Sequence, residues 1–395
     1  MHIDIQILIK QHNEILTILN QNNTNNSRLV GGCVRDFLQN QKISEDVDIS
    51  TIFTPDEIIE IFQKYKKENP RKNCVIIDKD KKYGTIIVIL NNQRYEITTT
   101  RSDIDCFGRQ AEVEFCTDFQ KDSNRRDFTI NALYLGFDGT IFDFHEGLKD
   151  LEHNIIRFIG DPEQRIKEDF LRILRYFRFA TKFNFFNFDK TILSKIQLLK
   201  PGLRLLSRER IRNEIYKMLE YDNWLTGLKA LHTNNLIKEI FVLDNYEINS
   251  KNINFNNTKK HSKLHNIVKL FYFFNYNKNT ITLLKELLRF TREEKIFCDF
   301  LTNFWTKTNN GTELTLDAKI VLFDLKKEIR EQYILDIIDL FLPNIQKEII
   351  DFEKNIKPLT INTNDLIKQG YVGKQLGDKI QEFKIEFIKN NFKTI

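Results

Sequence analysis

Short runs of β-branched and apolar residues alternate with helical patterns over roughly the first 160 residues. The runs predict strands at 28–30, 47–50, 73–77, 84–90, 94–99, 130–136 and 140–144. Helices are predicted over 34–40 and 55–67, the second capped by Thr54 with Pro55 in its first turn. Before them, apolar positions from Ile3 to Leu19 lie on one face of a single amphipathic helix.

The β pattern almost vanishes after residue 160. Apolar residues then recur at helical spacing, and they predict helices over 164–182, 207–220, 264–274, 280–290, 292–305 and 328–342. The pattern therefore predicts a mixed α/β head followed by an all-helical remainder. We place the divisions at 1–160, 161–220 and 221–395.

Composition narrows the class of protein. A chain of 395 residues with 41% hydrophobic residues can build two to four domains. The net charge of +5 permits nucleic-acid binding through local patches without requiring it. Five scattered cysteines without CxxC pairs predict neither disulfides nor zinc, and no apolar run is long enough to span a bilayer. No signal-peptide pattern precedes the head, so we expect a cytoplasmic protein.

The first candidate site combines a glycine turn with two carboxylates. Gly31 and Gly32 follow a predicted strand and begin a helix that carries Arg35, an arrangement in which backbone amides can approach a phosphate. Asp46 and Asp48 are two residues apart at the next strand, so both side chains lie on one face and can bind the same cations. Together these residues predict a triphosphate and metal site for nucleotidyl transfer, with Mg²⁺ as the expected ion.

Glu96 is a third candidate carboxylate. It alternates with Arg94 and Thr98 along the predicted strand 94–99. On a neighbouring strand it would supply a further metal ligand or a base. The alternative is a solvated glutamate on a strand face.

Four motifs occur in series along residues 25–220. They are Gly31-Gly32-Cys33-Val34-Arg35-Asp36, Asp46-Val47-Asp48, Arg125-Arg126-Asp127-Phe128-Thr129-Ile130-Asn131-Ala132 and Glu168-Asp169-Phe170-Leu171-Arg172. This series resembles class II tRNA nucleotidyltransferases (CCA-adding enzymes) and the related bacterial poly(A) polymerases, within the DNA polymerase β superfamily.

The resemblance implies a fold and a set of roles. The fold would be an α/β nucleotidyltransferase head followed by a helical neck, body and tail. Asp46 and Asp48 would be catalytic metal ligands, and Gly31, Gly32 and Arg35 would contact the triphosphate. The segment with Arg126, Asp127 and Asn131 matches the family motif that contacts ribose and phosphates. Asp36 is expected to be a structural partner of Arg35.

Asp169 and Arg172 can also be analysed as chemistry. Three residues apart on the predicted helix 164–182, they would share a face and form an edge with one acceptor and one donor. Cytosine and adenine both offer an amino donor beside a ring-nitrogen acceptor, whereas uracil and guanine offer the reverse. Each mismatched buried group costs about 1–3 kcal/mol, so such an edge would select CTP and ATP without a nucleic-acid template. The alternative is an ordinary surface ion pair.

Weaker candidates lie further along the chain. Arg175 continues the same helix and would line the nucleotide pocket, the RNA path or a solvated stripe. Residues 101–115 form a charged segment that the family uses as a flexible loop in switching from C to A addition. Residues 370–377, with three glycines beside Tyr371 and Lys374, would meet an RNA phosphate or form a plain helical turn. A basic cluster at 259–265 would be a phosphate contact or a solvated loop.

These observations predict template-independent addition of CCA to the 3′ end of tRNA from CTP and ATP. Close alternatives are a poly(A) polymerase that uses ATP alone and an enzyme restricted to CC or A addition. A non-catalytic RNA-binding protein is a further alternative, but both carboxylates are intact. The sequence does not determine the oligomeric state.

Overall fold

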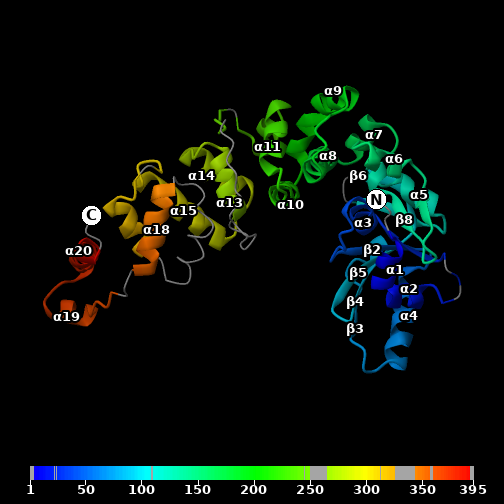
Figure 1. The fold of residues 1–395 in the computed structure, drawn as a ribbon, viewed down its shortest axis with the longest axis horizontal. Coiled ribbons are helices and arrows are strands. Elements are labelled where there is room, and N and C mark those ends of the chain that lie inside the picture. The colour runs from blue at the N-terminus through cyan, green and yellow to red at the C-terminus, as the bar shows by residue number, and fades with distance from the viewer. Residues whose placement is uncertain are drawn as a thin grey trace. The chain divides into compact units, whose positions relative to one another are not determined.

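The computed structural model describes residues 4–21, 23, 25–107, 110–243, 245–249, 265–311, 313–324, 343–355 and 359–391. The chain forms two compact units (Figure 1). Unit 1 comprises Met1–Leu206 with Ala230–Leu236, and unit 2 comprises Ser207–Lys229 with Ile237–Ile395. We describe each unit by itself.

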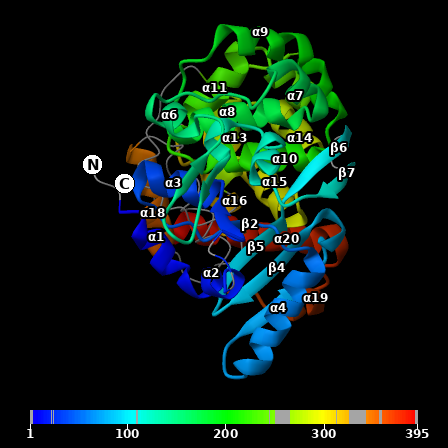
Figure 2. The same cartoon turned by 90° about the vertical axis from the view of Figure 1, so that its right-hand side faces the viewer.

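A seven-stranded mixed sheet forms the centre of unit 1 (Figures 1 and 2). Its strand order is β3-β4-β5-β2-β1-β8-β9. Strands β2 and β5 pair in parallel, and the other neighbours pair antiparallel. The strands are β1 (Ser27–Val30), β2 (Val47–Thr51), β3 (Cys74–Ile77), β4 (Thr85–Leu90), β5 (Gln93–Thr99), β8 (Leu133–Leu135) and β9 (Ile141–Asp143).

Alternation along β5 gives the sheet two different faces. Tyr95 and Ile97 are buried, and Tyr95 contacts the buried His12 between helices α1 (Gln6–Gln11) and α2 (Asn13–Leu19). Helix α4 (Pro55–Glu68) lies beside α2 and begins with a capping box at Thr54. Glu96 alternates with these buried residues, so it lies on the face opposite to α1 and α2.

The segment 101–115 is a β-ribbon, which corrects the prediction of a loop. Strands β6 (Arg101–Phe107) and β7 (Gln110–Phe115) pair antiparallel as a separate two-stranded sheet. Charged residues at alternate positions (101, 103 and 105, then 112 and 114) do give this sequence the period of two of a strand, but the high charge of the segment also resembles a solvated loop. Gly108 and Arg109 lie outside the described residues.

Three predicted elements are divided in the structure. The N-terminal helix is two helices that meet at His12, and the predicted strand 130–136 is a 3₁₀ turn, η2 (Thr129–Asn131), followed by β8. The predicted helix 164–182 is two helices, α7 (Pro162–Glu168) and α8 (Leu171–Phe183). Between them Asp169 is extended, with φ −153° and ψ 105°, and its side chain accepts the Leu171 amide at 3.1 Å. A short polar side chain competes in this way with the helical backbone and begins a new helix.

Helices complete both units. In unit 1 they are α3 (Gly32–Asn40), α5 (Phe119–Asn124), α6 (Gly147–Glu152) and α9 (Lys190–Leu199), with the 3₁₀ turns η1 (Lys81–Tyr83) and η3 (Lys200–Leu205). Unit 2 contains α10 (Arg208–Leu219), α12 (Ile237–Phe241), α13 (His265–Phe273), α14 (Lys278–Leu287), α15 (Arg292–Lys307), α16 (Leu316–Phe323), α18 (Pro343–Asn355), α19 (Thr363–Lys368) and α20 (Gly373–Asn391). Helix α11 (Trp224–Thr233) contributes residues to both units.

Aromatic packing forms the core of unit 2. Phe271 and Tyr276 both pack on Trp305, and Tyr276 stacks on it with ring centroids 3.9 Å apart. Arg212 of α10 donates to the buried Glu294 of α15 at 2.6 Å and 2.8 Å, which joins two helices of this unit. The predicted helix 328–342 and the basic residues Lys259 to Lys263 lie outside the described residues.

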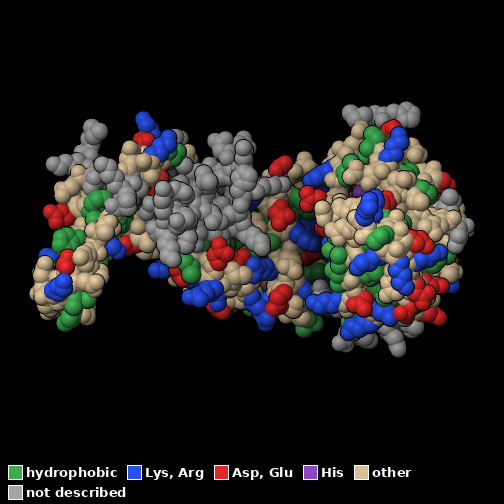
Figure 3. Space-filling model, turned by 90° about the horizontal axis from the view of Figure 1, so that it is seen from below, with side chains coloured by type: hydrophobic (Ala, Val, Ile, Leu, Met, Phe, Trp, Pro, Cys, Tyr) green, Lys and Arg blue, Asp and Glu red, His purple; other side chains and the backbone are tan. Residues whose placement is uncertain are grey.

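The described residues show the hydropathy of the helices, and one face of the molecule shows how surface charge is distributed. Within the described ranges, no helix is long and apolar enough to cross a membrane. On the face in Figure 3, Lys and Arg side chains are interspersed with Asp and Glu, as expected for a net charge of +5.

Candidate functional site

Gly31 forms the turn between β1 and α3. Its backbone has φ 72° and ψ −121°, a conformation that favours glycine, and its carbonyl accepts the Arg35 amide to begin the helix. The Gly31 amide itself donates to the Leu133 carbonyl at 3.1 Å. The Gly31 amide is therefore bonded within the protein, and the predicted contact of Gly31 with the triphosphate stays a prediction. Gly32, as first residue of α3, begins the turn whose amides lie at the helix N-terminus.

The predicted carboxylates gather at β2 and β5. Asp48 and Glu96 are partners in the parallel register, so their side chains lie on the same face of adjacent strands. Asp46 precedes β2, is 87% exposed and lies 3.7 Å from Arg94, which also donates to Glu96 at 3.0 Å. The structure thus brings Asp48 and Glu96 together and leaves Asp46 beside them at the start of the strand.

Asp48 is the carboxylate of this group whose negative charge is least favoured by its surroundings. Its side chain reaches solvent, but surrounding protein removes part of its hydration. This loss of hydration, and then the charges of Glu96 and Asp46, raise the pKa of Asp48 to about 6, against the opposing charge of Arg126. Like charges held together in this way favour a bound cation.

The donor set fits a hard divalent ion. In the described part of the chain, no three His, Cys, Asp or Glu side chains are gathered closely enough to hold a metal. Mg²⁺, however, is bound through one or two carboxylates together with substrate phosphates and water. Asp48 with Asp46 or Glu96 meets that requirement, and all the donors are oxygen atoms, which suit this ion.

The Arg126 side chain also lies at the glycine turn. A Cβ built on Gly31 would lie 3.4 Å from Arg126 Nη1 and 3.9 Å from Asp48 Oδ2. A guanidinium and a carboxylate therefore both lie beside Gly31. A cation site beside a fixed guanidinium is the arrangement that a triphosphate requires.

Asp127 and Asn131 lie inside the protein, in a chain of polar contacts. Asn131 donates to Asp127 Oδ1 at 2.9 Å, and Arg175 of α8 donates to Asp127 Oδ2 at 2.6 Å. Burial alone would raise the pKa of Asp127, but the Arg175 guanidinium and the Asn131 amide hold that pKa well below its usual range. This pair fixes α8 to the segment that carries Arg126.

Arg35 is also buried and paired. Its side chain is 5% exposed and bonds to Asp36 and to the Asn131 side-chain oxygen. Asp36 receives a second cation, Lys182 of α8, at 2.6 Å. Burial and the charge of Arg35 lower the pKa of Lys182 to about 8, although Asp36 opposes them. The contacts give Arg35 a supporting position behind the glycine turn, and its predicted contact with the triphosphate stays a prediction.

Asp169 and Arg172 do not share a face of one helix, so that premise is wrong. Asp169 is the extended residue between α7 and α8, whereas Arg172 is in the first turn of α8. Arg172 Nη1 donates to the Arg165 carbonyl and to Glu168, both at 2.7 Å. Its charge contributes to the low pKa of Asp127, which places Arg172 close to the Arg126 segment.

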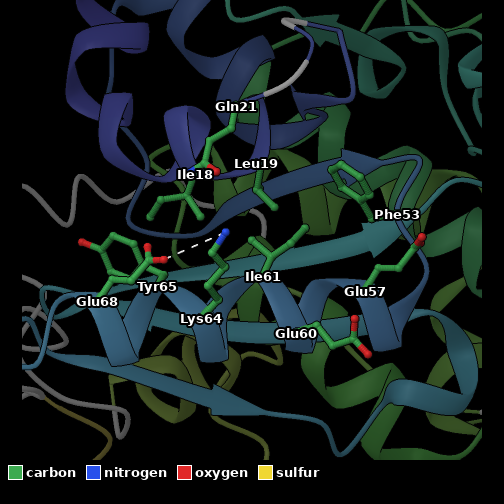
Figure 4. A pocket seen from close by; sticks show the side chains of 10 residues that line it. All are labelled: Ile18, Leu19, Gln21, Phe53, Glu57, Glu60, Ile61, Lys64, Tyr65 and Glu68. Atoms are coloured by element: carbon green, nitrogen blue, oxygen red, sulfur yellow. Dashed lines mark ion pairs between the residues drawn. The ribbon is translucent and has the colours of Figure 1, made fainter.

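Other predicted contacts lie elsewhere. Gly370 and Gly373 have positive φ, and a Cβ built on either residue would meet nothing within 4 Å. A cavity of about 270 Å³ lies between α2 and α4 (Figure 4), lined by Ile18, Leu19, Gln21, Phe53, Glu57, Glu60, Ile61, Lys64, Tyr65 and Glu68. It contains none of the predicted site residues, so we do not assign the chemistry to it.

The chain matches two family models. One, described as the poly A polymerase head domain, matches residues 27–157. The other, described as a probable RNA and SrmB-binding site of polymerase A, matches residues 185–242. The chain is also 31% identical over 408 residues to "CCA tRNA nucleotidyltransferase 1, mitochondrial" of Mus musculus, an alignment that covers 99% of this chain and 89% of that protein. The chain belongs to the CCA tRNA nucleotidyltransferase family.

Further relatives and solved structures agree with this assignment. The "CCA-adding enzyme" of Streptococcus gordonii is 39% identical over 212 residues, covering 53% of this chain and 50% of that protein. The Bacillus stearothermophilus CCA-adding enzyme in complex with CTP has a TM-score of 0.72 at 22% identity and covers 97% of this chain and 94% of its own. The Thermotoga maritima CCA-adding enzyme complexed with tRNA has a TM-score of 0.61 at 21% identity, covering 100% and 97%. The structural matches confirm the predicted fold, and the sequence matches confirm the predicted family.

Several residues beside the candidate site could not be predicted from the sequence. Arg165 donates to the carbonyls of Arg125 and Arg126 at 2.6 Å and 2.9 Å, which fixes the motif backbone to α7. Asp122 and Tyr134 bond to the Arg126 side chain. Only Asp122 carried a recognisable pattern, because it lies three and four residues before two arginines in a short helix.

We expect Gly31→Ala to impair the site more than the fold. Alanine at φ 72° and ψ −121° costs about 1–3 kcal/mol, and its methyl group would stand 3.4 Å from Arg126 Nη1. Nucleotide incorporation should fall by about tenfold or more while the chain stays folded. Gly32→Ala is the matched control, because only the tip of Arg35 lies near the added Cβ, at 3.8 Å. Equal activity of the two variants in a steady-state assay would contradict this assignment.

Arg175→Gln should destabilise unit 1 in a pH-dependent way. The substitution leaves the buried Asp127 without its main cation, at a cost of about 3 kcal/mol near neutral pH. Because the pair depresses the pKa of Asp127, its stabilisation exists above the unfolded pKa of about 4 and is lost as pH falls below that value. The difference in unfolding free energy between the variant and the wild type should therefore shrink in urea unfolding as the pH falls from about 5 toward about 2. The exposed pair of Lys167 serves as control, since Lys167→Gln should change stability by less than about 1 kcal/mol at either pH.

Proposed function

We propose that this protein adds CCA to the 3′ end of tRNA, using CTP and ATP and no nucleic-acid template. The observation that carries the proposal is that Asp48, Glu96, Gly31 and Arg126 lie together beside the central strands β1, β2 and β5 of the sheet. One relative that carries the name of this activity aligns over 99% of this chain. The structures of the Bacillus and Thermotoga enzymes hold CTP and tRNA respectively.

Asp46 and Asp48 would hold the divalent metal on which this family depends, and we propose that it is Mg²⁺. When bound, Mg²⁺ neutralises charge on the triphosphate and favours ionisation of the attacking hydroxyl. Glu96 provides a third carboxylate in register with Asp48, as a ligand or as the base that accepts the hydroxyl proton.

The residues of the chain orient the reacting groups. Arg126 Nη1, next to Gly31, would bind the phosphates, and the first turn of α3 would contribute its amides. The RNA 3′-hydroxyl then attacks the α-phosphate, and a new phosphodiester bond forms. The bond from the α-phosphate to the β-phosphate breaks, and Arg126 would stabilise the negative charge on the pyrophosphate that leaves. Asp127, Asn131 and Arg35 hold this arrangement in place from the interior.

Asp169 and Arg172 would choose the base. Both bonds of Arg172 use Nη1, so within the described chain its Nη2 and Nε face no protein acceptor and can donate to a base. Asp169, extended beside it, would accept from the exocyclic amino group of cytosine or adenine. The break between α7 and α8 thus supplies the acceptor and donor from two elements. Arg175 would act through Asp127.

A direct test supplies tRNA without its 3′ CCA and each of the four nucleotides in turn with Mg²⁺. We expect incorporation of CMP first, then AMP, and neither UMP nor GMP. A poly(A) polymerase is the second candidate, since a family model of that name matches the head. It would incorporate ATP without CTP. No incorporation by the folded protein would support the RNA-binding alternative instead.

The cellular location stays a proposal. The cysteine pattern favours the cytoplasm, whereas the Mus musculus relative is named as mitochondrial. Fractionation of cells that express the full chain would distinguish the two.

A further inference from the structure

A fully buried carboxylate lies behind Arg126. Asp122 of α5 has a side chain that is 0% exposed, yet it keeps its charge, because five groups from four segments of the chain donate to it. Burial raises its pKa, but the charges of Arg125 and Arg126 bring the pKa of Asp122 down to about 2. The donors are Ser50 Oγ, the Arg101 amide, the Arg125 side chain, the Arg126 side chain and Tyr134 Oη.

The two oxygens of Asp122 have different partners. Oδ1 accepts from Arg125 at 2.8 Å and from the Arg101 amide at the base of the β6–β7 ribbon at 3.4 Å. Oδ2 accepts from Tyr134 Oη at 2.7 Å, from Arg126 Nη2 at 3.4 Å and from Ser50 of β2 at 3.2 Å. One carboxylate therefore connects the ribbon, the strand of Asp48 and Arg126.

Tyr134 completes a closed triangle with Asp122 and Arg126. Its hydroxyl donates to Asp122 and accepts from Arg126 Nε at 3.1 Å. Its ring is fully buried and packs edge-on against Phe119 and Phe144. The hydroxyl therefore has a fixed position.

The triangle determines where the third nitrogen of Arg126 lies. Nε is bound by Tyr134, Nη2 by Asp122, and Nη1 lies beside Gly31 and the Asn131 carbonyl. A planar guanidinium held at two of its nitrogens has no remaining freedom to rotate. Without these two bonds, Arg126 could adopt other rotamers at little cost, and the Nη1 atom would leave the glycine turn.

We propose that Asp122 and Tyr134 are positioning residues that hold Arg126 against the Gly31 turn, in the orientation that binds a nucleoside triphosphate. They touch no substrate themselves and act only through Arg126. The inference rests on the proposed function for the identity of the ligand, but the contacts that carry it do not involve RNA or base choice.

Equilibrium binding of CTP to the full chain, in Mg²⁺ and without RNA, tests the proposal. Tyr134→Phe removes one hydroxyl and keeps the ring, and we expect it to weaken CTP binding about five- to tenfold. Asp122→Asn keeps the size of the side chain and should weaken binding about tenfold or more. Tyr65→Phe is the matched control, because its hydroxyl also donates to a carboxylate, Glu14, at the remote α2–α4 cavity (Figure 4). It should bind CTP like the wild type.

A double-mutant cycle with Arg126→Lys separates positioning from general destabilisation. Lysine keeps the charge but has no planar fork, so Tyr134→Phe should change CTP binding by less than about twofold in that background. If the two substitutions instead weaken binding additively, or if Tyr134→Phe lowers thermal stability without changing CTP binding, the proposal is wrong. A wild type that binds CTP but does not extend tRNA would refute the proposed function and leave this cycle interpretable.

Discussion

Replacing Asp48 by Asn is expected to reduce nucleotide incorporation by about three orders of magnitude or more. The substitution keeps the size of the side chain and removes the carboxylate that pairs in register with Glu96 and lies beside Gly31. Because the raised pKa of Asp48 shows that its charge is disfavoured in the folded protein, the neutral amide should not lower the melting temperature. Activity and stability should thus respond in different directions, which distinguishes a site residue from a structural one.

Asp56→Asn is the matched control for this experiment. Asp56 is exposed in the first turn of α4, where it pairs with Lys81. Its replacement should leave incorporation near the wild-type rate and change stability by about 1 kcal/mol or less. If Asp48→Asn keeps more than about a tenth of the activity, the carboxylates of β2 and β5 are not the metal site.

Replacing Arg172 by Ala is expected to reduce the discrimination between bases more than the overall rate. Both bonds of its guanidinium use Nη1, and Nε and Nη2 are the groups that would pair with a ring nitrogen. Losing them should lower the preference for CTP over UTP by about 10- to 100-fold in kcat/KM, the value of one or two mismatched groups. The measurement is a competition assay with CTP and UTP on the same RNA.

The ratio of kcat/KM for CTP to kcat/KM for UTP distinguishes a loss of base selection from a loss of folded protein. Arg172→Ala also releases Glu168, so some loss of stability is expected, but partial unfolding would reduce both nucleotides equally. Lys167→Gln in the preceding helix should leave the ratio unchanged. An unchanged CTP to UTP ratio for Arg172→Ala would contradict the assignment of this residue to base selection.

Much of the head could be predicted because its strands are short apolar runs that begin and end at turn-forming residues. The sequence predicts Asp48 and Glu96 on neighbouring strands. It does not predict the parallel register that pairs the two residues, because that register is a tertiary property. The β6–β7 ribbon was missed because its charges resemble those of a loop.

The break at Asp169 was missed for a different reason. The apolar period of 3.6 continues across residues 164–182, and periodicity alone cannot show that one side chain caps the next helix. Asp122 and Tyr134 were missed because their importance depends on contacts with Arg126 and Ser50 that no local pattern encodes. The buried hydrogen bonds of Asp122 and Tyr134 could therefore be identified only from the structure.

The length and sequence of the product made from tRNA without its 3′ end test the central claim most directly. With CTP, ATP and Mg²⁺ in excess, the account predicts three added nucleotides that read CCA, and no further extension when the incubation is prolonged. A long A tail, or a product that contains UMP or GMP at wild-type Arg172, would contradict it.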